Sequence, residues 1–272
     1  MGPKATHEET RTPPLRWAGS KRKLLDELQA ELPTSFDTYV EPFVGSACLY
    51  FRVQPRKAIL ADLNVNLIQF YRAARVAPNA VLRSAIHFRR SRAGYYRARA
   101  RYGGERNAVR RASLFLFLNR FCFNGIYRTN ASGKFNVPFG TRTGAFPTFH
   151  RFRLAARSLS RAKLLCSDFE PVVAQARRDD FVYLDPPYVY RSRKDRGEYG
   201  PGSFSLEDIP RLRRTLENLD RRGVRFLLSY LDCEEVQPLR SRFAQRTIPV
   251  ARTVSGLVAT RQVVSEVLVR NY

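Results

Sequence analysis

Over its first 76 residues the chain alternates short apolar runs with amphipathic segments. Leucines at helical spacing predict a helix that begins after Ser20, as its N-cap, and ends at Pro33. Beyond it, strands are expected at 38–40 and 58–62, each followed by a helix, at 47–52 and 64–75. This βαβα order is typical of a parallel sheet with crossover helices, so the predicted fold class is α/β.

The pattern changes between residues 77 and 148. Arginine-rich helical segments lead there into a loop rich in Gly, Asn and Pro, which predicts an inserted, mainly helical subdomain. The alternation then returns, with strands expected at 162–166, 181–184, 225–230 and 263–269, and helices at 206–222 and 235–243. Residues 1–76 and 149–272 are therefore expected to form one domain, interrupted by the insert at 77–148.

The chain is strongly basic, and its charge is unevenly distributed. Lys and Arg number 48 against 24 Asp and Glu, which gives a net charge of +24. Between Leu63 and Lys163, Glu105 is the only acidic residue, while the same stretch holds 21 Lys or Arg. Such a field favours a polyanionic partner.

Cysteine and histidine placement gives no support to metal chemistry. The 4 Cys include no C-x-x-C pair and the 3 His are isolated, so neither a metal site nor a histidine base is expected. The polar N-terminus lacks a signal-peptide core, and the longest apolar run, 114–126, is interrupted by Asn119, Arg120 and Asn124. A soluble protein inside the cell, in the cytoplasm, is expected, without membrane contact.

The tetrapeptide Asp185-Pro186-Pro187-Tyr188 follows an apolar run that is typical of a buried parallel strand. Ligands of open α/β sheets bind just beyond the carboxyl ends of such strands. Asp185 and the Pro186 carbonyl can accept the two protons of an exocyclic amino group, and Tyr188 can stack on a flat base. These four residues therefore form the predicted catalytic motif. The competing interpretation is a plain proline-rich exit from a strand.

Other strand ends carry candidate residues for binding a nucleoside. Gly45 lies in a strand-to-helix turn, where free backbone N–H groups can approach a ligand. Asp62 ends the next strand, at a spacing suited to accepting hydrogen bonds from ribose hydroxyls. Asp168 and Phe169 follow a further strand and are placed to flank an adenine ring. Together these residues predict a nucleoside cofactor beside D-P-P-Y.

Several segments, in one fixed order, resemble the motifs of the alpha-class DNA adenine-N6 methyltransferases of the Dam type. They are R-W-A-G-S-K at 16–21, E-P-F-V-G at 41–45, A-D-L-N at 61–64, the segments 119–128 and 133–140, and D-P-P-Y at 185–188. The resemblance runs from Arg16 to the end of the chain. It implies a Rossmann-like S-adenosylmethionine-dependent methyltransferase sheet, in which the insert is the DNA-recognition subdomain.

The resemblance also implies a reaction and its participants. The enzyme would move a methyl group from S-adenosylmethionine, without a metal, to an adenine flipped out of double-stranded DNA, with GATC as the first expected site. One copy of each motif suffices for a monomer. The implied cofactor contacts are Trp17, Lys21, Phe43, Gly45, Asp62, Asp168, Phe169 and Asp185.

DNA contacts are expected from the segment 119–128. Arg128 is the main candidate for a bidentate contact to a guanine edge. By the resemblance, Asn124 and Ile126 contact DNA beside it, Phe123 is placed to wedge into the base stack, and Arg120 is a further DNA-binding candidate. The competing interpretation for Phe123 and Ile126 is core packing.

The chain departs from the family pattern at three places. Ala47 stands where a second glycine is usual, so that turn must accommodate a methyl group. Phe123 stands where tyrosine is frequent, which removes a phenolic hydrogen bond. Ser20 replaces one glycine of a pair near Lys21.

Other functions remain open at this point. An RNA adenine or a DNA cytosine-N4 methyltransferase would share the cofactor site, although Asp185 and the insert favour DNA adenine. A catalytically silent DNA-binding relative is a third alternative. A protein glutamine methyltransferase has no need of so basic an insert. The sequence does not distinguish a restriction-modification enzyme from a phage or housekeeping one.

Overall fold

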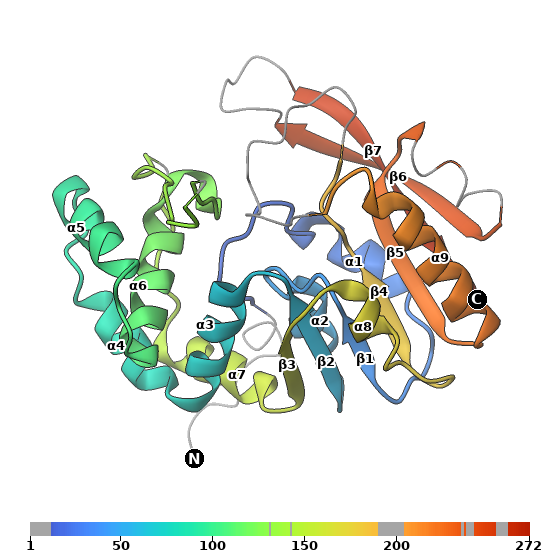
Figure 1. The fold of residues 1–272 in the computed structure, drawn as a ribbon, viewed down its shortest axis with the longest axis horizontal. Coiled ribbons are helices and arrows are strands. Elements are labelled where there is room, and N and C mark those ends of the chain that lie inside the picture. The colour runs from blue at the N-terminus through green and yellow to red at the C-terminus, as the bar shows by residue number, and fades with distance from the viewer. Residues whose placement is uncertain are drawn as a thin grey trace.

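The computed structural model describes residues 12–130, 132–141, 143–189, 204–234, 237, 242–253 and 261–272. Within these ranges, strands form one 7-stranded sheet in the order β3-β2-β1-β4-β5-β7-β6 (Figure 1). The strands are β1 (Tyr39–Glu41), β2 (Ala58–Asp62), β3 (Ala162–Cys166), β4 (Phe181–Leu184), β5 (Arg225–Leu231), β6 (Ala244–Thr253) and β7 (Arg261–Arg270). The first five in chain order are parallel, and β7 runs antiparallel to both β5 and β6. The predicted α/β sheet is confirmed.

Helices cover both faces of the sheet, because successive strand residues point to opposite sides. Tyr39 and Phe181 belong to one hydrophobic core, whereas their neighbours Val40 and Val182 belong to the other. The first core includes side chains of α1 (Leu25–Ala30), α2 (Cys48–Val53), α3 (Val65–Val76) and α7 (Phe149–Leu159). The second includes α8 (Phe169–Val173) and α9 (Asp208–Arg221), which lie in front of the sheet in Figure 1.

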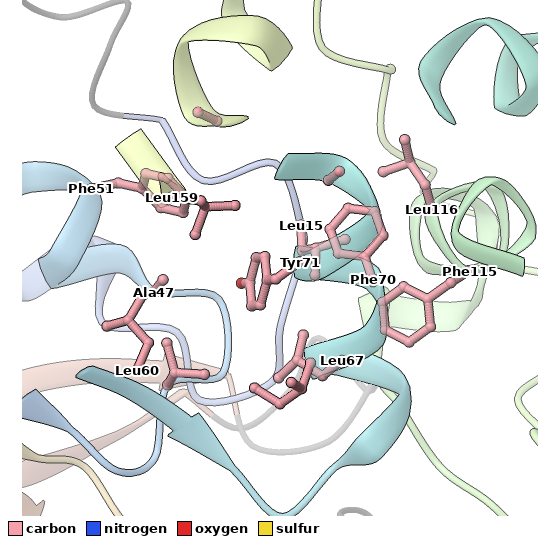
Figure 2. Packing of buried hydrophobic residues seen from close by; sticks show 14 of the residues in the cluster. Leu15, Ala47, Phe51, Leu60, Leu67, Phe70, Tyr71, Phe115, Leu116 and Leu159 are labelled. Carbon is pink, nitrogen blue, oxygen red and sulfur yellow. The ribbon is translucent and has the colours of Figure 1, made fainter. Parts of the chain in front are cut away.

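The arginine-rich segment forms a group of helices beside the β3 edge of the sheet. It contains α4 (Pro78–Ile86), α5 (Arg92–Tyr102) and α6 (Ala108–Phe121) (Figure 1). Phe70 of α3 stacks on Phe115 of α6 with ring centroids 5.3 Å apart, and Figure 2 shows the two rings meeting between their helices. The first core is therefore continuous from the sheet into these helices, and the domain boundary at residues 76 and 77 stays a prediction.

The expected strands agree with the structure to within two residues at each end, and two details differ. Ser20 does not cap the first helix, because the chain passes through a 3-10 turn at Arg22–Leu24 and α1 begins only at Leu25. Strand β6 was not predicted. Most of the expected helix at 235–243 lies outside the described residues. Among the helices that the structure describes, none has both the length and the apolar character needed to cross a membrane.

Candidate active site

The carboxyl ends of the central strands open into a cavity between the sheet and the N-terminal segment. Including its opening to solvent, the cavity holds about 970 Å³ of space. Its walls come from residues 17–21, from the turn that follows β1, and from the ends of β2, β3 and β4. Among the predicted residues, the cavity is lined by Trp17, Lys21, Phe43, Gly45, Asp62, Phe169, Asp185, Pro186, Pro187 and Tyr188.

Asp185 is held at the floor of this cavity by donors from two distant segments. Its Oδ1 atom lies 2.5 Å from Lys21 Nζ and accepts a hydrogen bond of 3.1 Å from Ser229 Oγ on β5. The Ser229 hydroxyl is itself 2.9 Å from the Tyr183 hydroxyl on β4. Tyr183 and Ser229 are both buried. Lys21 and Ser229 therefore fix the orientation of the Asp185 carboxylate directly, and Tyr183 supports it through Ser229.

Lys21 is a buried cation, with 6% of its side chain exposed. Burial is the largest single effect and lowers the pKa of Lys21, but Asp185, Tyr188 and Glu266 together raise it by more, so the net shift of the pKa is upward. Burial has the opposite effect on the acid: it raises the pKa of Asp185, and the Lys21 ammonium group opposes that shift. The ammonium also donates to the Gly19 carbonyl at 3.2 Å and lies 4.9 Å from the centre of the Tyr188 ring. The ion pair therefore links the N-terminal segment to the D-P-P-Y motif.

Tyr188 is oriented by packing against β5. Its ring meets Tyr230 edge-on, with centroids 5.2 Å apart, and the Tyr230 hydroxyl accepts a hydrogen bond of 3.1 Å from the Val189 amide. Since both tyrosines belong to or contact the second core, the ring cannot rotate freely. One aromatic surface is thus held beside Asp185.

Glu41, at the end of β1, is a buried acid that the sequence prediction did not single out. Its Oε2 atom accepts a hydrogen bond of 2.9 Å from the Tyr39 hydroxyl. Burial raises the pKa of Glu41, and the Tyr39 bond opposes the shift. The residue lines the cavity, as Lys21 does. Its presence in E-P-F-V-G is the signal that could have identified it.

The turn after β1 is tied to the end of β2 through Asp62. The two carboxylate oxygens accept backbone hydrogen bonds from Gly45 N at 3.1 Å and Asn64 N at 2.9 Å. Burial raises the pKa of Asp62 to about 6, although these two bonds oppose the shift. Gly45 has φ +44, and an added Cβ atom would lie 2.9 Å from Trp17 Cδ1. Glycine is therefore required here by both its conformation and its close approach to Trp17.

Ala47 adopts the left-handed conformation that the usual glycine would favour. Its φ is 56° and its ψ 35°, at the N-cap of α2. The methyl group is fully buried and packs in the first core near Leu60 (Figure 2). Ala47 is absent from the residues that line the cavity. The departure from the family pattern therefore strains the backbone without narrowing the site.

An aromatic group forms the far wall of the cavity. Phe43 stacks on Phe169 with centroids 5.3 Å apart, and Phe204 meets Phe43 edge-on at 5.8 Å. Asp168, which was expected to flank a cofactor ring, does not line the cavity. It caps α8 through Glu170 N and pairs with Arg211 at 2.6 Å. Its carboxylate is used to anchor α8 to α9, and its assignment to the cofactor remains untested.

Trp17 is positioned by the carboxyl end of α6. Asn119 Oδ1 accepts a hydrogen bond of 2.9 Å from Arg16 N, and Asn119 Nδ2 donates one of 2.6 Å to the Arg16 carbonyl. The side-chain amide of Asn119 therefore forms with the Arg16 backbone the two hydrogen bonds that a neighbouring strand would form, although Asn119 itself lies in a helix. A buried polar residue inside an apolar run was the signal for it. Arg120, the neighbouring candidate for DNA contact, is half-buried and donates to the Pro14 carbonyl.

The remaining candidates lie in residues 122–130 and 132–140, which we call the recognition loop. Bridges between Cys122 and Phe139 and between Thr129 and Phe135 fold it into a hairpin-like pair. Arg128 Nε donates a hydrogen bond of 2.8 Å to Asn136 Oδ1, so the G-K-F-N segment orients the guanidinium.

The first residues of the recognition loop are accessible. Phe123 is 38% exposed and Asn124 is also exposed, with Asn124 in the left-handed conformation at φ 52°. Ile126 is half-buried. Packing in the core therefore does not explain why a phenylalanine occurs at position 123.

The helices beside the recognition loop carry an exposed basic surface. Exposed arginines occur on α4, α5 and α6 and in the segments that join them. They are Arg83, Arg89, Arg90, Arg92, Arg97, Arg101, Arg106 and Arg110. Glu105 is the only acidic residue of this region, and it is used locally to pair with Arg101 at 3.1 Å. The surface is suited to phosphate contacts.

Comparison with known proteins identifies the family. The family model described as D12 class N6 adenine-specific DNA methyltransferase matches residues 17–254. The chain belongs to this family. It is 32% identical over 260 residues to the DNA adenine methylase of Escherichia coli K12, covering 93% of each protein. It is 31% identical to the type II methyltransferase M1.LlaDCHI of Lactococcus lactis, covering 94% of each, and 33% identical to the DNA adenine methylase of Serratia marcescens, covering 93% of this chain and 96% of that enzyme.

This membership agrees with the architecture and with D-P-P-Y at the sheet edge. The chain is an adenine-specific DNA methyltransferase, as the resemblance of its motifs predicted. The match begins at Trp17 and includes the recognition loop and strands β1 to β6.

Proposed function

We propose that the protein uses S-adenosylmethionine to methylate N6 of an adenine that is flipped out of double-stranded DNA, with GATC as the first site to test. The observation that carries this proposal is Asp185, a carboxylate fixed at the cavity floor by Lys21 and Ser229 beside the Tyr188 ring. A base can reach this motif only if it leaves the helical stack. The family supports adenine as the base.

The residues that line the cavity fit S-adenosylmethionine. Lys21 is the cation suited to its carboxylate, Asp62 the acceptor suited to its ribose hydroxyls, and Phe43 with Phe169 the apolar surface suited to its adenine. Gly45 and Trp17 complete the wall of the cavity. They lie so close together that no side chain larger than that of glycine fits at position 45. When bound, this cofactor supplies a methyl group that is already activated, so the protein needs no covalent nucleophile for the transfer.

The protein's part in the reaction is to orient the target amino group. In the described part of the chain, the hydrogen-bond donors to Asp185 both reach Oδ1, which assigns Oδ2 to a proton of the adenine amino group. The Pro186 carbonyl accepts the second proton. Both bonds draw the nitrogen lone pair out of conjugation with the ring, and Tyr188 holds the ring by stacking. Positioning and fixed charges of this kind account for several orders of magnitude in rate.

The Lys21–Asp185 ion pair also suggests an order of events. Lys21 pairs with the Asp185 carboxylate at 2.5 Å. If Lys21 also held the carboxylate of the cofactor, its ammonium group would bind Asp185 less tightly, and Asp185 would be a stronger acceptor for the adenine amino group. Binding of the cofactor is therefore expected to precede productive binding of the flipped base.

DNA recognition is assigned to the insert. Its exposed arginines supply phosphate contacts, so affinity is expected to fall steeply as salt rises. Arg128, oriented by Asn136, is assigned a bidentate contact to guanine, and Asn124 and Ile126 are assigned contacts beside it. Phe123, exposed near the start of the recognition loop, is assigned to the gap that the flipped adenine leaves.

The direct test is nucleoside analysis of DNA treated with the purified protein and S-adenosylmethionine. Digestion and mass spectrometry should reveal N6-methyldeoxyadenosine with the wild type and none with Asp185→Ala, although Asp185→Ala should still bind DNA. Sequencing of the methylated positions then tests GATC. Formation of N4-methylcytosine, or equal activity of Asp185→Ala, would contradict the assignment.

A further inference from the structure

Tyr127, the residue directly before Arg128, lies where the cofactor cavity meets the recognition loop. It is buried, with 6% of its surface exposed. Its ring stacks on Trp17 with centroids 5.8 Å apart and an interplanar angle of 17°. Trp17 lines the cavity, but Tyr127 does not. A ligand that restricts the motion of Trp17 therefore also restricts Tyr127, and the backbone of Tyr127 leads directly to Arg128.

The Tyr127 hydroxyl is connected to the opposite wall of the cavity as well. It accepts a hydrogen bond of 2.7 Å from Asn66 Nδ2 on α3. The Asn66 backbone amide in turn donates to Asn64 Oδ1 at 3.1 Å, and the Asn64 amide donates to Asp62 Oδ1 at 2.9 Å. A continuous series of hydrogen bonds thus runs from the predicted ribose acceptor to Tyr127.

The same residues are connected to the body of the insert. Asn66 Oδ1 accepts a hydrogen bond of 2.7 Å from Arg111 on α6. On the loop side, the Arg128 carbonyl accepts one of 3.1 Å from the Asn136 amide, and Asn136 also holds the guanidinium. Tyr127 is therefore the point at which contacts from both cavity walls reach the loop that carries Arg128.

We propose that Tyr127 is a positioning residue that couples the two substrates, so that cofactor in the cavity strengthens DNA binding by the recognition loop and DNA strengthens cofactor binding. The proposal rests on the proposed function. The physical basis is ordering: a ligand packed against Trp17 and Asp62 restricts Tyr127, and the second ligand then meets a loop that is already ordered. By thermodynamic linkage the two enhancements must be equal.

The test measures binding rather than turnover. The dissociation constant of S-adenosylhomocysteine is determined by calorimetry with and without a GATC duplex, and that of the duplex with and without S-adenosylhomocysteine. For the wild type, both ratios should be equal and at least about 5-fold, the lower end of typical coupling. Tyr127→Phe keeps the stacked ring but removes the bond from Asn66, so its ratio should fall well below that of the wild type.

Tyr50→Phe is the matched control. Tyr50 is another buried tyrosine, and its hydroxyl donates to the Ser158 carbonyl on α7, which belongs neither to the cavity nor to the recognition loop. Its variant should keep the wild-type ratio. A thermal unfolding curve for each variant establishes that it is folded before its ratio is interpreted.

The outcomes separate this inference from the function on which it rests. A wild type that binds both ligands independently, with a ratio of one, or a Tyr127→Phe ratio equal to that of the wild type, overturns the coupling role and leaves the methyltransferase assignment standing. A wild type that binds neither ligand overturns both. Loss of coupling in Tyr127→Phe alone supports the inference.

Discussion

Asp185 in the catalytic cavity and Arg128 in the recognition loop are held in place by different means. Asp185 is fixed by Lys21, 164 positions away in the sequence, and by Ser229, 44 positions away. Arg128 is fixed by Asn136, only 8 positions away. The proposed catalytic carboxylate thus depends on the assembled sheet, whereas the arginine proposed to read a base depends on a local turn.

This difference has a consequence for how such an enzyme can change. Local contacts in an exposed loop can be replaced without disturbing the core, so the recognition site can change while the reaction is kept. The buried ion pair cannot be altered on one side alone, because the remaining charge would lie in the interior without its partner. The predictions below test this separation, from the largest expected effect to the smallest.

Removal of the cation is expected to have the largest effect. Lys21→Met leaves the Asp185 carboxylate buried without its partner, and the free energy of unfolding near neutral pH should fall by about 3–5 kcal/mol. Because the pKa of Asp185 in the folded variant lies above that of the unfolded chain, stability should recover as the pH falls through that raised pKa. Urea unfolding at several pH values measures both effects.

The double variant Lys21→Met/Asp185→Asn is the control, since it removes both charges. It should recover most of the stability that Lys21→Met loses, while remaining inactive. A Lys21→Met protein as stable as the wild type would show that the ion pair does not hold the site together.

A substitution in the recognition loop should act on discrimination alone. Asn136→Ala releases the Arg128 guanidinium, and the preference for the cognate guanine over another base should fall by up to about 1–3 kcal/mol. The rate at saturating cognate DNA should stay close to that of the wild type. Methylation rates on matched and single-base-altered duplexes measure this change, and Arg128→Ala gives the limiting value. Equal loss on every duplex would show that Asn136 supports the catalytic cavity instead.

Asp62 predicts a pH dependence of cofactor binding. Its pKa is raised to about 6 in the protein without ligand, from 3.8 for an ordinary aspartate. Ribose hydroxyls donate to the ionised form, so binding lowers this pKa, and affinity should be constant above about pH 6 and should fall below it. Calorimetric titration with S-adenosylhomocysteine between pH 5 and 8 would show this break. Asp62→Asn should bind more weakly at every pH, without the break.

Ala47→Gly should have the smallest effect. Relief of the left-handed backbone, about 1–2 kcal/mol, is offset by the loss of a buried methyl group, about 0.8 kcal/mol, and by the greater freedom of glycine in the unfolded chain. Stability measured in urea should therefore change little. Cofactor affinity should not change, since the methyl group faces the core near Leu60. A large gain in affinity would mean that the methyl group obstructs the site.

The sequence predicted the parts of the fold that depend on local pattern. Strand β4 is buried on both faces and β2 is nearly so, and such parallel strands carry near-continuous apolar runs, so both were located closely. Strand β3 lies at an edge of the sheet with Lys163 exposed, and its adjacent Leu164 and Leu165 sufficed to locate it. Strand β6 was missed because it lies at the sheet edge and carries Arg246 and Pro249, which interrupt the apolar pattern. Edge strands need no second apolar face.

The candidate site was predictable as a set of residues but not as a set of contacts. Motif order brought Lys21 and Asp185 to the same cavity, yet nothing local indicates that they form an ion pair. Ser229 and Asn119 were missed because each is a single polar residue in an apolar segment, and its partner lies far away in the sequence. Ser20 has the chemistry of a helix cap, but its hydroxyl instead lies 2.9 Å from Cys48 Sγ.

One paired measurement tests the separation of reaction and recognition most directly. Single-turnover methylation by Ser229→Ala and by Asn136→Ala is compared with that of the wild type on a cognate duplex and a base-altered one. Ser229→Ala removes a hydrogen bond to a charged group, and its rate should fall by about 10–100-fold, equivalent to about 1.5–3 kcal/mol, to the same extent on both duplexes. Asn136→Ala should change the ratio between duplexes and leave the cognate rate nearly intact. Altered discrimination in Ser229→Ala, or a uniform loss in Asn136→Ala, would contradict the account.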